Sequence, residues 1–473
     1  MLRRTLPLIL STAAFVVSSY AANVWLGRHL GPADYGVLGV VTSLISAFNV
    51  MQVSGVPQAM SKFIAEDTDH GDDILAAGLK LQLLLSAVLM VVFAGVGPLL
   101  ARLFHDPAIT GYMLVAAFVL PGYALFTAFG GYYNGLHRFG RQARINATYA
   151  VAKVALIIGL AIQFGLVGAL LGYAISPVVA LITGLHQPHR TYTFDVRKLV
   201  RLSAPLVVFA GLSLLQYSVD LFTVKAVVHA KATAGYYVAA QSIAIIPFLG
   251  LAALGQVLLP SVSRLLAEGR RDDAAAAVAQ MVRYLLMLLL PATALIAGSA
   301  PALVRLLFGH AYVPAAPSLR LLVTGYIAVT AFALFASVLN GAGRATTAMR
   351  LAGVALIVTF VLCVVLVPPF KLLGAAASTG VGALVATIGA AITTRRMLAF
   401  RISALSLARI ALASTVVLAL AWLPVPPALL PLSWLGLALL YAVLLMVGGE
   451  ISAHERQQAL AMVPARLRRR SPL

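Results

Sequence analysis

The feature that most constrains this chain is a series of apolar segments that recur along nearly all of its 473 residues. A membrane-spanning helix needs about 20 consecutive, mostly apolar residues. Fourteen segments meet that requirement, at residues 6–26, 36–57, 77–100, 111–133, 146–164, 166–185, 203–226, 235–258, 281–303, 318–340, 347–367, 372–393, 404–423 and 430–449. Two long apolar stretches are divided here, at Gly165 and at Pro368-Pro369. The sequence therefore predicts an all-α, polytopic membrane protein with fourteen transmembrane helices.

The composition agrees with a chain that lies almost wholly in a membrane. Apolar residues make up 61% of the chain and charged residues 10%, whereas soluble domains have roughly 45–50% and about 25%. A soluble enzyme, a secreted disulfide scaffold and a disordered chain are thereby excluded. The single cysteine, Cys363, excludes an internal disulfide and any multi-cysteine metal site. The net charge of +20 does not predict nucleic-acid binding, because the basic residues lie between apolar runs and not on a soluble face.

The distribution of Lys and Arg predicts the orientation. If the N-terminus lies inside, 26 of the 34 Lys and Arg residues fall on the cytoplasmic side. This is the positive-inside pattern of multi-pass proteins, and an odd number of spans would destroy it. Arg3-Arg4 before an apolar run could also indicate a signal peptide, but the run is longer than a usual signal core. We therefore expect a retained first helix, both termini in the cytoplasm, and a location in the inner (cytoplasmic) membrane.

An internal repeat predicts the domain organisation. The segment from Asn134-Gly135 aligns without gaps on the segment from Asn340-Gly341, at a constant offset of 206 residues. The Asn-Gly pairs are expected to end a helix in each copy. Chance similarity between Ala/Leu-rich stretches is the alternative, but matched loop residues at one offset argue against it. An offset near 200 residues contains six predicted helices, and an even number gives both copies the same direction through the membrane.

The repeat thus predicts two parallel six-helix lobes followed by two extra helices. The predicted parts are an N-lobe at 1–186, a cytoplasmic inter-lobe linker at 187–202, a C-lobe at 203–397, two helices within 398–449 and a basic cytoplasmic tail at 450–473.

Ionisable residues inside the predicted spans are the candidate site, because each costs several kcal/mol in hydrocarbon. Asp220 is either a proton or sodium site, a partner for a cation between the lobes, or a structural acid. Lys153 is either a phosphate-binding cation facing a central cavity or a lysine that reaches the cytoplasmic headgroups. Arg28 is either a cavity cation or an interface anchor. Lys225 is a fourth candidate, poorly spaced on its helix for pairing with Asp220.

Motifs for other chemistry are absent from the sequence. It contains no Walker loop and no Gly-x-Ser-x-Gly elbow, so we expect no catalytic residue and no cofactor. His186 and His189 lie in a Pro-containing loop with no third ligand nearby, so no metal site is expected. The acidic residues of segment 66–73 are expected to be solvated and to cap the third helix. Any transport by a chain of this kind is passive, partner-driven or ion-coupled.

Several short motifs resemble those of a known family. Leu-Gly-Pro-Ala-Asp-Tyr-Gly at 30–36, Ser-Gly-Val-Pro at 54–57 and Ser-Lys-Phe-Ile-Ala-Glu at 61–66 resemble the first helical hairpin of polysaccharide-biosynthesis membrane proteins. These proteins belong to the multidrug/oligosaccharidyl-lipid/polysaccharide exporter superfamily. Further matches are Asp220, Gly235-Tyr236-Tyr237, the segment 306–312 and Gly374-Ala375-Ala376.

The resemblance implies a flippase that moves polyprenyl-pyrophosphate-linked oligosaccharide between leaflets by alternating access of two lobes. Its implied partners are lipid-linked oligosaccharide, membrane lipids and proteins of glycan polymerisation and synthesis, and they include no nucleic acid. Three alternatives stay open: a cation-coupled small-molecule or multidrug exporter, a lipid II-type flippase, and a pseudo-transporter that scaffolds glycan synthesis. The spans carry few charges and show no cationic triad like that of lipid II flippases, which is a departure from that branch.

Overall fold

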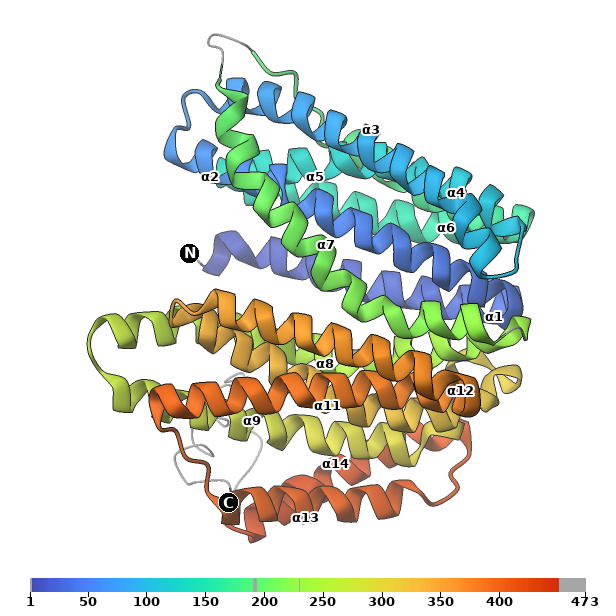
Figure 1. The fold of residues 1–473 in the computed structure, drawn as a ribbon, viewed down its shortest axis with the longest axis vertical. Helices are drawn as coiled ribbons and strands as arrows, with labels where there is room; N and C mark the ends of the chain where they lie inside the picture. The colour runs from blue at the N-terminus through green and yellow to red at the C-terminus, as the bar shows by residue number, and fades with distance from the viewer. Residues whose placement is uncertain (1, 190–193, 229, 451–473) are drawn as a thin grey trace, which may run out of the picture. The chain divides into compact units, whose positions relative to one another are not determined.

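The computed structural model describes residues 2–189, 194–228 and 230–450, with side chains omitted at 2–16, 205, 208–217, 249–261 and 267. Every regular element in these residues is a helix (Figure 1). The predicted all-α class is therefore confirmed. The chain divides into two compact units: unit 1 contains Met1–Ala239, Leu307–Ala315 and Leu356–Ser378, and unit 2 contains Ala240–Leu306, Ala316–Ala355 and Thr379–Leu473.

Unit 1 is a bundle built mainly from the first seven helices. They are α1 (Leu2–Ser54), α2 (Val56–Glu66), α3 (Gly71–Leu103), α4 (Ala108–Ala117), α5 (Val119–Gly135), α6 (Phe139–Leu181) and α7 (Val196–Val227). Helix α1 packs against α5, α6 and α7, and α3 packs against α4 and α5. A buried cluster that includes Met60, Ile74, Phe129 and Tyr133 lies between these helices. The short η1 (His310–Ala315) and the central part of α12 complete the unit.

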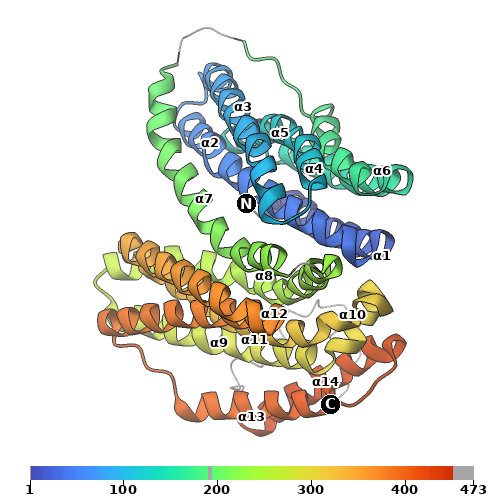
Figure 2. The ribbon, with the colours of Figure 1, turned by 45° about the vertical axis from the view of Figure 1, so that its right-hand side comes forward.

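Unit 2 contains most of the later helices. They are α8 (Lys231–Ala267), which begins in unit 1, α9 (Arg271–Gly298), α10 (Ala300–Phe308), α11 (Ala316–Gly341), α12 (Ala345–Leu398), α13 (Ala404–Ala421), the short η2 (Pro427–Leu429) and α14 (Leu430–Val447). Helix α9 packs against α11, α13 and α14, and Figure 2 shows α13 and α14 joined by a short connection.

Three of the long helices are interrupted by one residue with a non-helical backbone. These residues are Gly31 in α1, Gly165 in α6 and Lys371 in α12. Gly165 (φ 56°, ψ −133°) lies where the sequence predicts a boundary, and Lys371 (φ 50°, ψ −122°) follows the predicted Pro368-Pro369 joint by two residues. Glycine adopts a positive φ without a side-chain clash. Each long helix therefore consists of two arms.

The backbone repeats at the offset that the sequence alignment gives. Helices α5 and α11 end at the Asn-Gly pairs, as predicted. His137 (φ 56°) and Gly343 (φ 74°) then adopt the left-handed conformation, two positions later than the glycines of those pairs. In both turns the N–H of the following arginine donates to the carbonyl five residues earlier, at 2.8 Å. The two turns thus share one geometry, although only one of them has a glycine at the left-handed position.

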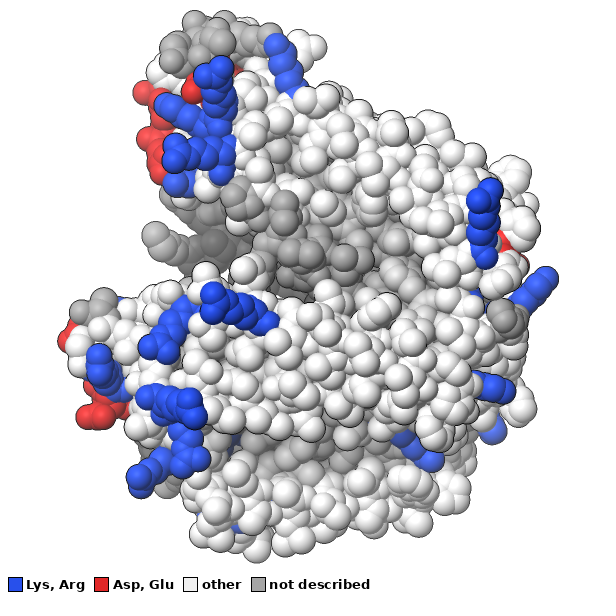
Figure 3. All heavy atoms as spheres, viewed as in Figure 1, with Lys and Arg blue, Asp and Glu red and all other residues white. Residues whose placement is uncertain are grey.

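The exterior of each unit has the surface of a membrane protein. Among the described residues, nine helical segments are long and apolar enough to cross a membrane. On α3 the side chains of Leu84, Val88, Val91 and Leu99 are exposed, Val91 to 72%. Figure 3 shows Lys, Arg, Asp and Glu gathered near helix ends and largely uncharged flanks between them. Apolar side chains can remain exposed over so large an area only against lipid. The protein is therefore a multi-pass membrane protein.

A buried carboxylate fastens the last helix of unit 2. Glu450, which follows α14, is 6% exposed. Its carboxylate accepts a hydrogen bond from Arg283 Nε of α9 at 2.7 Å and another from the Ser406 hydroxyl of α13. Arg409 Nη1 lies 3.8 Å from the same carboxylate. Since a buried charge that loses its partner is strongly destabilising, this network holds α13 and α14 against α9.

Substituting Gly168 by alanine should destabilise the bend of α6. A Cβ atom at Gly168 would lie 1.9 Å from the carbonyl oxygen of Leu160 on the other arm. Overpacking of this kind costs about 1–3 kcal/mol, which thermal unfolding of the purified protein will show as a lower Tm. Gly159→Ala is the matched control on the same helix, because nothing lies within 4 Å of its added Cβ. A Gly168→Ala protein with the unaltered Tm would contradict the close contact of the two arms.

Candidate functional site

The bend of α6 brings Lys153 close to a tyrosine twenty residues further along the chain. Beyond Gly165 the second arm of α6 returns along the first. Gly168 meets the backbone of Leu160, and Gly172 meets the backbone of Ile157. These glycines allow the two arms to approach closely because they have no side chains. Tyr173, the next residue, consequently lies beside Lys153.

Two aromatic rings and one hydroxyl surround the ammonium group of Lys153. Its Nζ lies 5.1 Å from the ring centroid of Tyr173 and 5.9 Å from that of Tyr149. The same Nζ donates a hydrogen bond to Ser19 Oγ of α1 at 3.1 Å. Cations within about 6 Å of a ring centroid are attracted by the ring face. The ammonium group of Lys153 is thereby directed toward α1. An ammonium group can also form a charge-assisted hydrogen bond to a phosphate.

Asp220 lies in a separate polar cluster of unit 1. Its side chain is 2% exposed. Its Oδ2 accepts a hydrogen bond from the Tyr237 hydroxyl of α8 at 2.8 Å, and its Oδ1 accepts one from the N–H of Leu221 at 2.7 Å. The Cys363 thiol of α12 lies nearby. A carboxylate among hydroxyl groups, within an apolar helix bundle, can take up a proton or a small cation.

Lys225 forms an ion pair with an acid of the turn between α3 and α4. Its Nζ lies 3.0 Å from Asp106 Oδ2, and the two side chains are 8% and 24% exposed. The sequence spacing predicts that Asp220 and Lys225 do not pair along their helix, and each has the partner described here on another element. Lys225 therefore joins the end of α7 to the start of α4.

Arg28 lies near the segment of unit 1 that comes from the second half of the chain. Its Nε donates to the carbonyl oxygen of Leu307 at 2.6 Å. Beside it, the Tyr312 hydroxyl donates to the carbonyl oxygen of Gly27 at 2.6 Å. These bonds join α1 to the segment Leu307–Ala315.

The acidic segment 66–73, which runs into the first turn of α3, is only partly solvated, contrary to the prediction. Asp73 is 3% exposed. Asp72 accepts hydrogen bonds from the Tyr132 hydroxyl at 2.5 Å and from the backbone N–H of His189 at 3.0 Å, and the His186 ring lies 3.0 Å away. The His186 ring also stacks on Tyr132. Both histidines are thus held at one carboxylate, which anchors the start of the predicted inter-lobe linker to α3 and α5.

Several partners of the candidate residues were not predicted from the sequence. Tyr149 stands one helical turn before Lys153, a spacing that places both on one face. Ser19 and Tyr173 meet Lys153 only because α1 packs on α6 and α6 bends. Asp106 lies in the turn between α3 and α4, and no sequence pattern relates it to Lys225.

Long apolar helices with ionisable groups held among them define a polytopic membrane protein. The inward closed conformation of the lipid II flippase MurJ has a similar fold, with a TM-score of 0.77 at 12% identity over 93% of this chain and 98% of that one. An inward-facing multidrug resistance MATE family transporter of the MOP superfamily gives a TM-score of 0.67 at 18% identity, over 81% of this chain and 94% of that one.

Sequence comparison places the chain in a family. The model of the polysaccharide biosynthesis protein family matches residues 25–317, so the chain belongs to that family and the predicted resemblance is confirmed. The uncharacterized membrane protein MJ1068 of Methanocaldococcus jannaschii is 27% identical over 130 residues, which are 28% of this chain. That match spans 26% of the length of the archaeal protein.

Proposed function

We propose that this protein is a flippase for a polyprenyl-pyrophosphate-linked oligosaccharide, a precursor of envelope polysaccharide. It moves the precursor from the inner to the outer leaflet of the cytoplasmic membrane by alternating access. The observation that carries the proposal is the position of Lys153, held by Ser19, Tyr149 and Tyr173 inside a bundle of this family. A diphosphate without a counterion has a prohibitive desolvation free energy in hydrocarbon. A neighbouring cation lowers that free energy by forming a charge-assisted hydrogen bond to the phosphate. The partly exposed ring of Tyr173 offers an apolar face for a sugar, while the prenyl tail stays in lipid.

The proposed topology has fourteen helices, with both termini in the cytoplasm. The breaks at Gly31, Gly165 and Lys371 support it, because each divides one long helix into two arms. We retain the proposed N-lobe at 1–186, linker at 187–202, C-lobe at 203–397 and final helices within 398–449. The proposed basic tail at 450–473 lies outside the described residues, except for Glu450.

Deleting the gene tests this function. We expect surface polysaccharide to be lost and its lipid-linked precursor to accumulate on the cytoplasmic leaflet, because the precursor is still made but no longer crosses. Both are measured in the same cells, by surface labelling of the glycan and by extraction of lipid-linked intermediates. Expression of the intact gene should restore export. Normal surface glycan without a stalled precursor would contradict the proposal.

Asp220 favours a second candidate function, a cation-coupled exporter of small molecules. A buried carboxylate hydrogen-bonded to Tyr237 is suited to binding a proton or sodium ion. This candidate predicts that the deletion strain becomes sensitive to organic cations, and unaltered sensitivity would exclude it. A lipid II-type flippase, another of the alternatives, predicts accumulation of the peptidoglycan precursor instead.

A further inference from the structure

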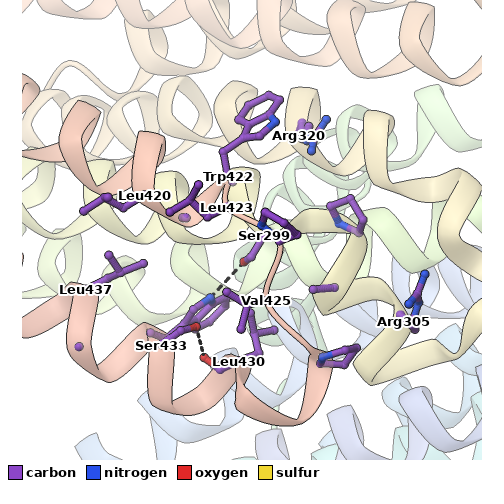
Figure 4. Close-up of a pocket in the computed structure, with 18 residues that line it drawn as sticks. Ser299, Arg305, Arg320, Leu420, Trp422, Leu423, Val425, Leu430, Ser433 and Leu437 are labelled. Carbon is purple, nitrogen blue, oxygen red and sulfur yellow. Dashed lines mark hydrogen bonds between the residues drawn. The ribbon is translucent and has the colours of Figure 1, made fainter.

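Unit 2 contains a cavity of about 560 Å³ where α9 and α13 end and α11 and α14 begin (Figure 4). Glu450 lies toward the other ends of these helices, where it contacts the first half of α9 and the start of α13. In the proposed orientation the cavity lies at the level of the outer leaflet. No role in the proposed translocation of the precursor requires this cavity.

Two arginines supply all the charge among the residues that line the cavity. They are Arg305 of α10 and Arg320 of α11, and the lining contains no aspartate or glutamate. Arg320 stacks on Trp422, with its guanidinium carbon 4.2 Å from the ring centroid, and its Nε donates to the carbonyl oxygen of Ala297 at 3.1 Å. Within the described part of the chain, neither arginine forms an ion pair with a carboxylate. The cavity therefore attracts anions.

The remaining wall of the cavity is mostly apolar. Leu420 and Leu437 lie on one side of the view in Figure 4, and Arg305 lies on the opposite side. Trp434 of α14 also lines the cavity, and its Nε1 donates to Ser299 Oγ at 3.0 Å. Tryptophans with a polar contact at one edge are typical of the level where lipid headgroups meet hydrocarbon. A ligand that contacts both the arginines and the apolar wall must have an anionic head and an apolar chain.

We infer that this cavity binds an anionic membrane phospholipid, with its phosphate at Arg305 and Arg320 and its acyl chain along α13 and α14. The planar guanidinium group matches phosphate oxygens through two parallel N–H donors. The outer flank of α14 continues the apolar wall into lipid, because Leu432 and Leu435 are 67% and 59% exposed. Free phosphate would use the arginines alone and would leave the apolar wall in water.

Lipid binding to the purified, delipidated full-length protein tests the inference. Phosphatidylglycerol should raise the unfolding temperature and remain bound in native mass spectrometry, whereas phosphatidylcholine should do neither. The variant Arg305→Gln/Arg320→Gln should bind phosphatidylglycerol about 100-fold more weakly, since one charge-assisted hydrogen bond is lost at each of the two arginines. Arg102→Gln is the matched control, since Arg102 is an exposed arginine near the end of α3 in unit 1 and should leave binding unaltered.

Four results would overturn the inference. They are equal binding of phosphatidylcholine, unaltered phosphatidylglycerol binding by the double variant, a full temperature shift from inorganic phosphate alone, and displacement of phosphatidylglycerol by a lower concentration of polyprenyl phosphate. Because Arg320 also holds the end of α9, the single variant Arg305→Gln provides a second test. Arg305 is exposed and has no hydrogen-bond partner among the described residues, so this variant keeps the fold and should still weaken binding.

Discussion

Replacing Lys153 by glutamine should reduce export of the lipid-linked precursor by about 10–100-fold, the range expected when a hydrogen bond to a charged group is lost. Glutamine keeps a polar side chain, but it removes the charge that the tyrosine rings and a diphosphate attract. Export is measured as the surface polysaccharide that each variant restores in the deletion strain, normalised to the amount of variant protein in the membrane.

Two variants make the Lys153 result specific. Lys153→Arg retains the charge and should restore most of the export. Lys80→Gln removes a lysine that is exposed on α3 and should behave as the unaltered protein. If Lys153→Gln restores the full amount of surface polysaccharide, the ammonium has no part in translocation and the flippase site must lie elsewhere.

Replacing Asp220 by asparagine should abolish the response of transport to an ion gradient. Asparagine keeps an oxygen that can accept the hydrogen bond from Tyr237, but it can neither bind a proton nor carry a negative charge. The coupling free energy between two binding events is typically 1–3 kcal/mol. The variant should therefore lose a stimulation of the transport rate by the gradient of about 5–150-fold. The measurement is the transport rate in proteoliposomes, with and without an imposed proton or sodium gradient.

Asp106→Asn is the control for Asp220. It removes an acid from the same unit by breaking the ion pair with Lys225, and it leaves the cluster at Tyr237 intact. We expect this variant to be less stable and to keep its gradient response. An Asp220→Asn protein with the same response as the unaltered protein would show that this carboxylate has a structural role only.

Local features of the structure were predictable because their causes are local. Hydropathy and length predict the helices, and glycine tolerates the positive φ at which α6 breaks, as at Gly165. The ends of α5 and α11 follow from Asn-Gly pairs. The left-handed residue after α5 was not predictable, because it is His137, for which a positive φ is uncommon.

Features that join distant parts of the chain were not predictable in the same way. Lys153 and Asp220 stand out in the sequence because charge is rare in apolar spans. Their surroundings depend on how helices pack: Tyr173 reaches Lys153 only after the chain turns back, and Tyr237 reaches Asp220 from another helix. The solvated state expected for the acidic segment 66–73 was wrong at Asp73, which is 3% exposed. It was incomplete at Asp72, since nothing local indicates that Tyr132 and His186 converge on its carboxylate.

The network at Glu450 has a consequence for biosynthesis. Arg283 is translated 167 residues before the carboxylate that neutralises it. At the usual 5–20 residues per second, the ribosome needs about 10–30 s to make that stretch. Throughout this interval the nascent α9 carries the Arg283 cation without the Glu450 carboxylate. Docking of the last two helices is therefore a terminal step of assembly, and a chain that stops short of Glu450 loses the contact that completes it.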